Sequence, residues 1–281
     1  MKKRRSNDSM GLQTEVEVRA LCLDYDGTIS PLSVPRSESR VLPESMTVLN
    51  QISRRIPVAV ITSKDLLFVV ERTPFAHAWF GLGGLEMKMG DVVTRASRLR
   101  NMAPYLRTAL KYAKNLSGND LTIEEKRDSN GVTVAFSVDW RQAKNVGEAK
   151  DRALKIFSHC KTSPLVTIKY EGQPFFDVFP CPVDKGKALL KLKRKLNLPN
   201  GILYMGDSMS DNAAFEVADI AVGVINDETP GDLVCDYFVK FEDVATCLHG
   251  LLTHNLHFNP KLPAILYRTE GLQHIQRLKF T

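Results

Sequence analysis

Two aspartates separated by a single residue, Asp24 and Asp26, follow a short apolar run near the start of the chain. The run, Ala20–Leu23, is typical of a buried strand, and Gly27 allows the chain to turn away directly after it. A strand that ends in two carboxylates brings both to the edge where open α/β sheets bind ligands. The same pattern also suits an ordinary turn, so the other motifs must decide between the two interpretations.

Three further segments place polar groups where a phosphate group would bind. Thr62 follows a second apolar run and offers a hydroxyl group beside backbone N–H groups at an expected helix start. Lys185 begins another expected helix, where its ammonium group can neutralise a phosphate oxygen. Asp207 and Asp211 lie at a turn from a strand into a helix. Each segment alone could be an ordinary helix cap or turn. Because all of them lie at strand ends or helix starts, together they indicate one site.

A divalent cation is expected at this site. Carboxylates that meet at one edge of a sheet repel one another unless a cation joins them. Oxygen ligands beside a phosphate substrate favour Mg²⁺.

Length and composition exclude several classes of protein. The chain has 281 residues, of which 43% are hydrophobic and 25% charged, enough for one large domain or two modest ones. No apolar run approaches the roughly 20 residues that cross a bilayer, and no secretory signal is evident. The five cysteines are odd in number and form no C-x-x-C pair. We therefore expect a cytoplasmic protein with free thiols and no membrane contact.

The net charge of +6, from 38 basic and 32 acidic residues, comes partly from the basic run at residues 2–5. We expect residues 1–15 to form a flexible basic tail. Interleaved aromatic residues, which single-stranded nucleic-acid binding would favour, are missing there, so nucleic-acid binding is not expected. The sequence carries no signal for an oligomeric state.

The elements that would position these residues follow an alternating order in the first and last parts of the chain. Strands are expected at residues 20–23, 58–61, 78–82, 201–205, 220–224 and 236–239, and helices at residues 45–55, 65–72, 185–196, 211–217 and 241–252. Strands that alternate with helices predict a Rossmann-like α/β core with a parallel sheet.

The middle of the chain breaks this order and predicts an inserted α+β domain. It contains an expected hairpin at residues 85–94, helices at 104–115 and 147–161, a strand pair at 121–126 and 132–138, and a second hairpin at 166–170 and 175–178. We therefore expect a core of residues 16–84 and 179–281 with an insertion at residues 85–178. We draw no functional inference for residues 254–281.

The four motifs together resemble those of the haloacid-dehalogenase-like (HAD) phosphohydrolases. They read LDYDGT, VITSK, DKGKAL and YMGDSMSDNAAF. The resemblance implies a HAD core with a C2B-type cap that supplies substrate contacts. It also implies that the metal is held by Asp24, the main-chain oxygen of Asp26 and Asp207, with support from Asp211, and that the phosphoryl group is held by Thr62, Ser63 and Lys185.

The resemblance also implies a two-step reaction. Asp24 would attack phosphorus and form an aspartyl-phosphate, which splits one difficult displacement into two. Asp26 would protonate the leaving alkoxide and then take a proton from the attacking water. Thr62 and Lys185 would complete the catalytic set by holding the phosphoryl group.

Within the superfamily, the chain is most similar to the trehalose-6-phosphate phosphatases. The resemblance implies that Glu124, Lys126 and Arg141 contact the sugar; a solvated strand face is the alternative interpretation. The chain departs from that family's pattern at Gly83, Asp139 and Asp177, which stand where His, His and Glu are usual.

The sequence therefore predicts a Mg²⁺-dependent phosphatase that acts on a small-molecule sugar phosphate. Trehalose 6-phosphate is the first candidate substrate, and another phosphorylated glycoside such as mannosyl-3-phosphoglycerate is the alternative of the same chemistry. A phosphomutase, in which the aspartyl-phosphate is protected from water, and a catalytically idle sugar-phosphate binder are alternatives of different classes.

Overall fold

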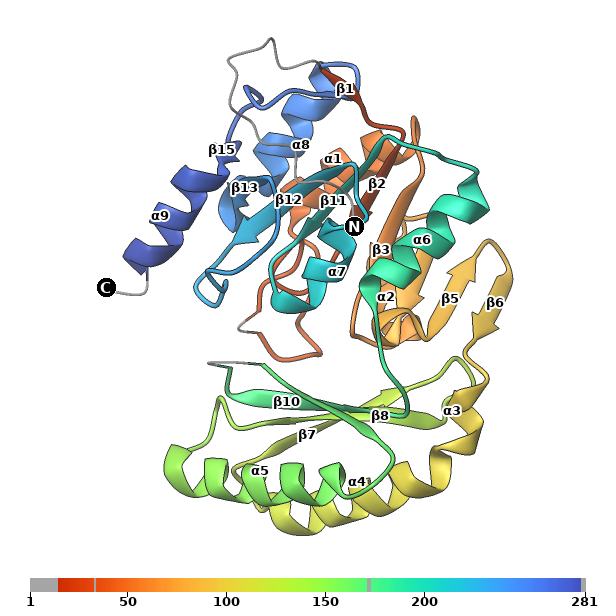
Figure 1. Ribbon diagram of the computed structural model, residues 1–281, viewed down its shortest axis with the longest axis vertical. Coiled ribbons are helices and arrows are strands. Elements are labelled where there is room, and N and C mark those ends of the chain that lie inside the picture. The colour runs from red at the N-terminus through yellow and green to blue at the C-terminus, as the bar shows by residue number, and fades with distance from the viewer. Residues whose placement is uncertain (1–14, 33, 171–172, 279–281) are drawn as a thin grey trace.

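The computed structural model describes residues 15–32, 34–170 and 173–278. A larger α/β body and a smaller layer of strands and helices lie one above the other in Figure 1. The predicted class, an α/β core with a parallel sheet and an inserted α+β unit, is confirmed. Apart from Glu15, the basic tail predicted at residues 1–15 lies outside the described residues, as does the expected turn at residues 171–172.

A nine-stranded sheet forms the body, and its six central strands run parallel to one another. In sheet order these are β13 (Tyr237–Lys240), β12 (Ile220–Ile225), β11 (Ile202–Gly206), β2 (Ala20–Leu23), β3 (Val58–Ile61) and β4 (Ala78–Gly81). The chain moves outward from β2 in one direction and from β11 in the other. The carboxyl ends of these two neighbouring strands are therefore a topological switch point, where α/β sheets bind ligands.

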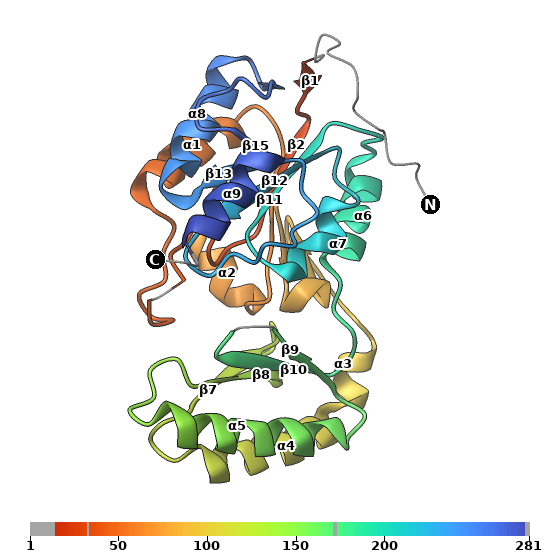
Figure 2. The ribbon, with the colours of Figure 1, turned by 60° about the vertical axis from the view of Figure 1, so that its left-hand side comes forward.

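Helices cover both faces of this sheet (Figure 2). One face packs against α1 (Pro43–Ser53), α2 (Leu66–Arg72) and α8 (Val244–Thr253), and the other against α6 (Lys185–Leu196), α7 (Asn212–Phe215) and α9 (Arg268–Leu278). Alternate residues of β2 divide between the two cores: Leu21 and Leu23 join the first, and Ala20 and Cys22 the second. Burial on both faces explains why this strand is apolar throughout.

Antiparallel strands extend both edges of the sheet. β15 (Leu266–Tyr267) pairs with β13, and the hairpin of β5 (Glu86–Met89) and β6 (Val92–Arg95) pairs with β4. This hairpin was expected to begin the insertion, but its partner is the large sheet. A hairpin has the same alternation of apolar and polar residues whichever sheet edge it joins. Its own residues therefore do not indicate that its partner strand is β4. We propose residue 96, instead of 85, as the start of the inserted domain.

The inserted domain, called the cap below, contains a four-stranded antiparallel sheet. Its order is β7 (Thr122–Arg127), β8 (Thr133–Asp139), β10 (Phe175–Phe179) and β9 (Val166–Lys169). The short α3 (Arg98–Asn101) leads into α4 (Ala103–Ser117), which covers the far face of this sheet together with α5 (Val146–Lys161). The face toward the body therefore carries the polar residues of β7, β8 and β10.

The C-terminal part of the chain differs most from expectation. The helix predicted at residues 211–217 is a 3₁₀ turn, Met209–Asp211, followed by the short α7, and α8 is preceded by a 3₁₀ turn at Phe241–Asp243. Beyond α8, β14 (His257–Phe258) pairs with β1 (Val16–Glu17). No helix in the described part of the chain is long and apolar enough to span a membrane.

Candidate active site

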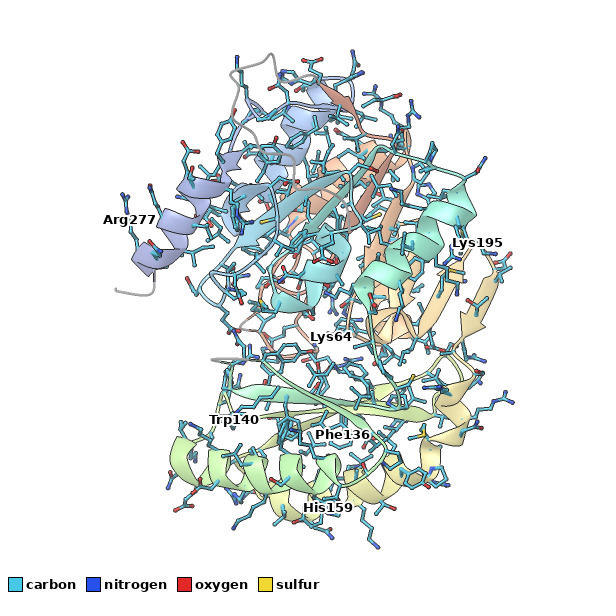
Figure 3. The ribbon with its side chains drawn as sticks, in the orientation of Figure 1. Lys64, Phe136, Trp140, His159, Lys195 and Arg277 are labelled. Atoms are coloured by element: carbon cyan, nitrogen blue, oxygen red, sulfur yellow. The ribbon has the colours of Figure 1, made fainter. Side chains whose placement is uncertain are left out.

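A cavity of about 570 Å³ lies between the carboxyl ends of the parallel strands and the polar face of the cap sheet. Lys64, labelled in Figure 3, lies at this junction, whereas Phe136 belongs to the cap interior and His159 to its outer side. The volume is within the range of about 300–1,000 Å³ typical of small-molecule sites. Of the predicted site residues, it is lined by Asp24, Asp26, Ser63, Glu124, Lys126, Arg141, Lys185 and Asp207.

Three carboxylates that are distant in sequence meet at this edge of the sheet. Oxygen atoms of Asp24, Asp207 and Asp211 lie within 4.8 Å of one another, and all three residues are buried. Asp24 and Asp207 follow the paired neighbouring strands β2 and β11, in which Leu23 lies opposite Met205. The register of the parallel sheet therefore brings the first two carboxylates together.

Lys185, the first residue of α6, is the cation of this cluster. Its Nζ lies 2.7 Å from Asp24 Oδ2 and 2.8 Å from Asp211 Oδ1, and its side chain is buried. Burial alone would lower the pKa of Lys185, but the carboxylates of Asp211 and Asp24 outweigh burial and hold its pKa above the ordinary value. Lys185 is therefore a fixed positive charge between two acids.

One lysine does not neutralise three buried carboxylates. Burial raises the pKa of Asp24 to about 7 despite the neighbouring Lys185. Burial, together with the charges of Asp24 and Asp211, raises the pKa of Asp207 well above its usual range. The site is therefore short of positive charge, which is the electrostatic condition under which a divalent cation binds.

Asp211 accepts four hydrogen bonds from the protein, two on each of its oxygen atoms. Oδ1 accepts hydrogen bonds from Lys185 and from the Tyr204 hydroxyl, the latter at 2.6 Å. Oδ2 accepts from the backbone N–H and the hydroxyl of Ser208, at 3.1 and 2.9 Å. This arrangement suits a residue that positions Lys185 and the loop after β11.

Asn226 forms hydrogen bonds with both the loop after β2 and the loop after β11. Its Nδ2 donates to Asp207 Oδ2 at 2.9 Å and to the main-chain oxygen of Gly27 at 3.1 Å. Gly27 itself has a φ of +71° and turns the chain so that its N–H donates to Ser30 O at 2.7 Å. Asp26, just before it, lies at the cavity with Oδ2 3.6 Å from Lys64 Nζ.

The loop after β3 presents Ser63 and Lys64 to the cavity, while Thr62 lies behind them. Thr62 is buried, and its Oγ1 accepts the N–H of Lys64 at 3.2 Å. Asp65 then caps α2 by accepting the N–H of Phe68 at 3.0 Å. The expected helix start is present, and its cap residue is Asp65.

On the cap side, Glu124 is surrounded by cations from the body. Its Oε1 lies 2.6 Å from Arg36 Nη1 and 3.3 Å from Lys64 Nζ. Burial raises the pKa of Glu124, but Lys64, Lys126 and Arg36 together outweigh burial and lower it to about 2. Glu124 is therefore a permanent acceptor at the cavity wall.

Lys126, the second residue expected to contact the sugar, forms a buried ion pair inside the cap. Its Nζ lies 2.8 Å from Asp177 Oδ1, which also accepts the Ser137 hydroxyl. The Tyr170 hydroxyl donates to the other oxygen of Asp177 at 2.9 Å. Asp177 thus organises the polar wall that the cap contributes to the cavity.

Arg141, the third such residue, bridges the cap and the body. Its Nη1 lies 3.4 Å from Glu228 Oε1, and its Nη2 lies 3.4 Å from Asp139 Oδ2.

Gly83, another departure from the family pattern, has a φ of +63°, and a Cβ there would lie 2.7 Å from Val183 Cβ. A side chain at residue 83 is therefore excluded by its surroundings.

Sequence reasoning assigned no role to Arg36, Lys64 or Asn226. Lys64 directly follows Thr62 and Ser63 in the second motif, so that adjacency was a usable signal. Arg36 lies in a proline-containing loop, and Asn226 gains its role from two loops that only the folded sheet brings together.

Comparison with known proteins identifies relatives of this chain. The family model described as sucrose-6F-phosphate phosphohydrolase matches residues 106–251. The trehalose-phosphate phosphatase of Mycobacterium tuberculosis is 26% identical over 212 residues, which cover 70% of this chain and 51% of that protein. The probable trehalose-phosphate phosphatase D of Arabidopsis thaliana is 25% identical over 210 residues, 69% of this chain and 55% of that protein. The chain thus spans about half the length of these curated relatives.

Solved structures share the fold. The C-terminal domain of the C. albicans trehalose-6-phosphate phosphatase superposes with a TM-score of 0.69 at 17% identity, covering 85% of this chain and 93% of that one. A trehalose-6-phosphate phosphatase related protein gives a TM-score of 0.63 at 16% identity, covering 84% and 98%. At these identities the likeness establishes the fold alone.

Proposed function

The chain belongs to the sucrose-6F-phosphate phosphohydrolase family, within the HAD superfamily, and from this premise we propose that it is a phosphatase of a sugar phosphate. The observation that carries the proposal is the convergence of Asp24, Asp207 and Asp211 within 4.8 Å beside Lys185. This cluster lies at the bottom of a cavity whose opposite wall is the polar face of the cap.

The proposed chemistry assigns roles to three residues that line the cavity. Asp24, which borders the cavity, attacks phosphorus while the bond from phosphorus to the ester oxygen breaks, so that an aspartyl-phosphate forms. Asp26 gives its proton to the leaving alkoxide and takes one from the water that then releases phosphate and restores Asp24. Lys185 offsets the negative charge of the phosphoryl group throughout.

We propose that the cluster holds Mg²⁺. Three buried carboxylates, two of which (Asp24 and Asp207) have raised pKa values, and a single lysine are a donor set that suits a hard divalent cation. Asp24, the main-chain oxygen of Asp26 and Asp207 would hold the ion, and Asp211 would position Lys185. When bound, Mg²⁺ supplies positive charge that stabilises the transferring phosphoryl group.

We propose a phosphate ester of a neutral disaccharide as the substrate. Trehalose 6-phosphate is the first candidate because the curated relatives are named for it, and sucrose 6F-phosphate is the second because the matching family is named for it. Glu124, Arg141 and the Asp177 cluster offer a wall of acceptors and donors for sugar hydroxyl groups. A cytoplasmic location is proposed on the five free cysteines.

A phosphate-release assay tests the function. We expect Mg²⁺-dependent release from one or more members of a panel that includes trehalose 6-phosphate, sucrose 6F-phosphate and mannosyl-3-phosphoglycerate. Asp24→Asn should reduce the rate by at least about 10³-fold while circular dichroism shows an intact fold. Retained activity in this variant would refute the assignment of the nucleophile. Isomerised sugar phosphate without phosphate release would indicate a phosphomutase, and binding without turnover an idle binder.

A further inference from the structure

We propose that Arg36 is a positioning residue that determines specificity, because it holds the cap carboxylate Glu124 in place against the cavity. The inference rests on the proposed phosphatase function and adds a residue of the body loop between β2 and α1. Arg36 belongs to none of the sequence motifs, and its role follows from its contacts on both sides of the cavity.

The body fixes Arg36 from two directions. Its Nη2 forms an ion pair with Asp65, which is buried and caps α2. Its guanidinium group stacks on Phe68, with the carbon Cζ 4.2 Å from the ring centroid. Phe68 in turn packs edge to face against Tyr25, the residue between the two catalytic aspartates. The position of the guanidinium group is therefore set by the same elements that set Asp24 and Asp26.

The other terminal nitrogen of Arg36, Nη1, contacts the cap. Nη1 lies 2.6 Å from Glu124 Oε1, and all three side chains at this crossing, those of Arg36, Lys64 and Glu124, border the cavity. Charge-assisted contacts of this length fix geometry as well as supplying energy. Glu124 thus takes its orientation from the body, although it belongs to β7 of the cap.

The location of this contact gives it influence over the cap. The connections between body and cap, at residues 96–97 and 180–184, lie on one side of the molecule, whereas the loop between β2 and α1 lies on the other (Figure 2). On the connection side, Arg95 Nε also donates to Ser129 Oγ at 2.9 Å. The Arg36–Glu124 contact therefore joins the cap to the body on the side away from the chain connections, where Lys64–Glu124 and Arg141–Glu228 also cross.

Loss of this contact should affect small and large substrates differently. A small ester such as p-nitrophenyl phosphate needs only the carboxylates and Lys185 of the body, whereas a disaccharide phosphate also reaches Glu124. Loss of Arg36 should therefore weaken the use of the larger substrate selectively. A residue with a purely structural role would lower both activities together.

The test is Arg36→Gln, assayed with the best sugar phosphate of the panel and with p-nitrophenyl phosphate. We expect the ratio of the two kcat/KM values to fall at least about tenfold, mainly through KM for the sugar phosphate. Arg40→Gln is the matched control, because Arg40 lies in the same loop but donates to the main-chain oxygens of Ser37 and Ser39. This control should leave the ratio unchanged.

Small-angle scattering of the same proteins provides a readout that needs no substrate. Arg36→Gln should have a larger radius of gyration than wild type, and Arg40→Gln should not. An unchanged ratio and an unchanged radius in Arg36→Gln would overturn the inference while the phosphatase function stands. A wild-type protein that releases phosphate from no ester would refute the function and the specificity role with it.

Discussion

Gly27 and Asp207 approach so closely that a Cβ on Gly27 would lie 2.0 Å from Asp207 Oδ2. The two residues belong to the loops after neighbouring strands β2 and β11, and Asn226 holds those loops together. Residue 27 must therefore lack a side chain if the carboxylates of Asp24 and Asp207 are to share one cation.

Gly27→Ala should abolish the metal site. We expect phosphatase activity to fall by at least about 100-fold, because the new methyl group displaces the Asp207 carboxylate. Gly90→Ala is the control: Gly90 also has a positive φ, +57°, but no atom lies within 4 Å of a Cβ built there. It shares the backbone strain without the clash. Equal losses of activity in the two variants would attribute the effect to strain.

The stability of the metal-free protein should fall as pH rises from 5 to 8. Asp24, with a pKa raised to about 7, and Asp207, with a raised pKa, hold protons more tightly in the folded than in the unfolded state. Stability is therefore highest where both are protonated and declines as pH rises through about 7. Glu124, with a pKa of about 2, is ionised across this window and adds only a constant.

Thermal unfolding with and without Mg²⁺ measures this effect. In chelator, we expect Tm to fall by roughly 5–10 °C between pH 5 and pH 8. Mg²⁺ binds the deprotonated carboxylates, so it should raise Tm more at pH 8 than at pH 5. Asp207→Asn should flatten the pH dependence and remove the Mg²⁺ response. A Tm that rises with pH in chelator would contradict the charge shortage described for this site.

The buried pair of Lys126 and Asp177 should be important for stability. Lys126→Met leaves the buried Asp177 carboxylate without its cation, with only the Ser137 and Tyr170 hydroxyl groups as partners, which should cost about 3–5 kcal/mol of unfolding free energy in urea denaturation. Lys126→Met combined with Asp177→Asn should recover part of this loss, because the remaining charge is removed. Lys114→Met, at the solvent-accessible pair with Glu125, should cost less than about 1 kcal/mol. Similar costs for the two lysines would show that burial of the pair has little effect.

Asn226 should control the affinity for Mg²⁺ without being a ligand. Asn226→Ala removes the donor shared by Asp207 and Gly27, so we expect the Kd for Mg²⁺, measured by titration calorimetry, to rise about 10- to 100-fold. Asn50→Ala serves as the control, since Asn50 donates to Met46 O within α1. An unchanged Kd in Asn226→Ala would mean that the two loops hold their positions by backbone packing alone.

The central sheet and the acidic cluster were predictable because their signals are local. A four-residue apolar strand followed by acidic residues reports both its burial and its end, as Ala20–Leu23 with Asp24 shows. The parallel α/β order then brings Asp24 and Asp207 to the same edge, whatever the length of the insertion between them. Even so, the motif alone does not show that the hydroxyl group of Tyr204, its first residue, donates to Asp211, because that contact forms only in the folded loop.

The cap was predictable as a set of elements but not as a surface. The spacing of Glu124 and Lys126 puts both on one face of β7, but the partner of Lys126 depends on the pairing of β8 and β10, which places Asp177 across the sheet. The edge that the β5–β6 hairpin joins and the contact from Arg36 to Glu124, 88 residues away, are likewise set by tertiary structure. Local patterns carry no information about such partners.

The cap has a hydrophobic interior of its own, built from α4, α5 and the far face of its sheet. Substitutions among the cavity-facing residues of that sheet leave the packing around β2 and β11 untouched. If the proposed function holds, natural variation in the cap can change which ester is accepted while the acidic cluster is inherited intact, and a graft of another cap onto this body would be a route to new selectivity.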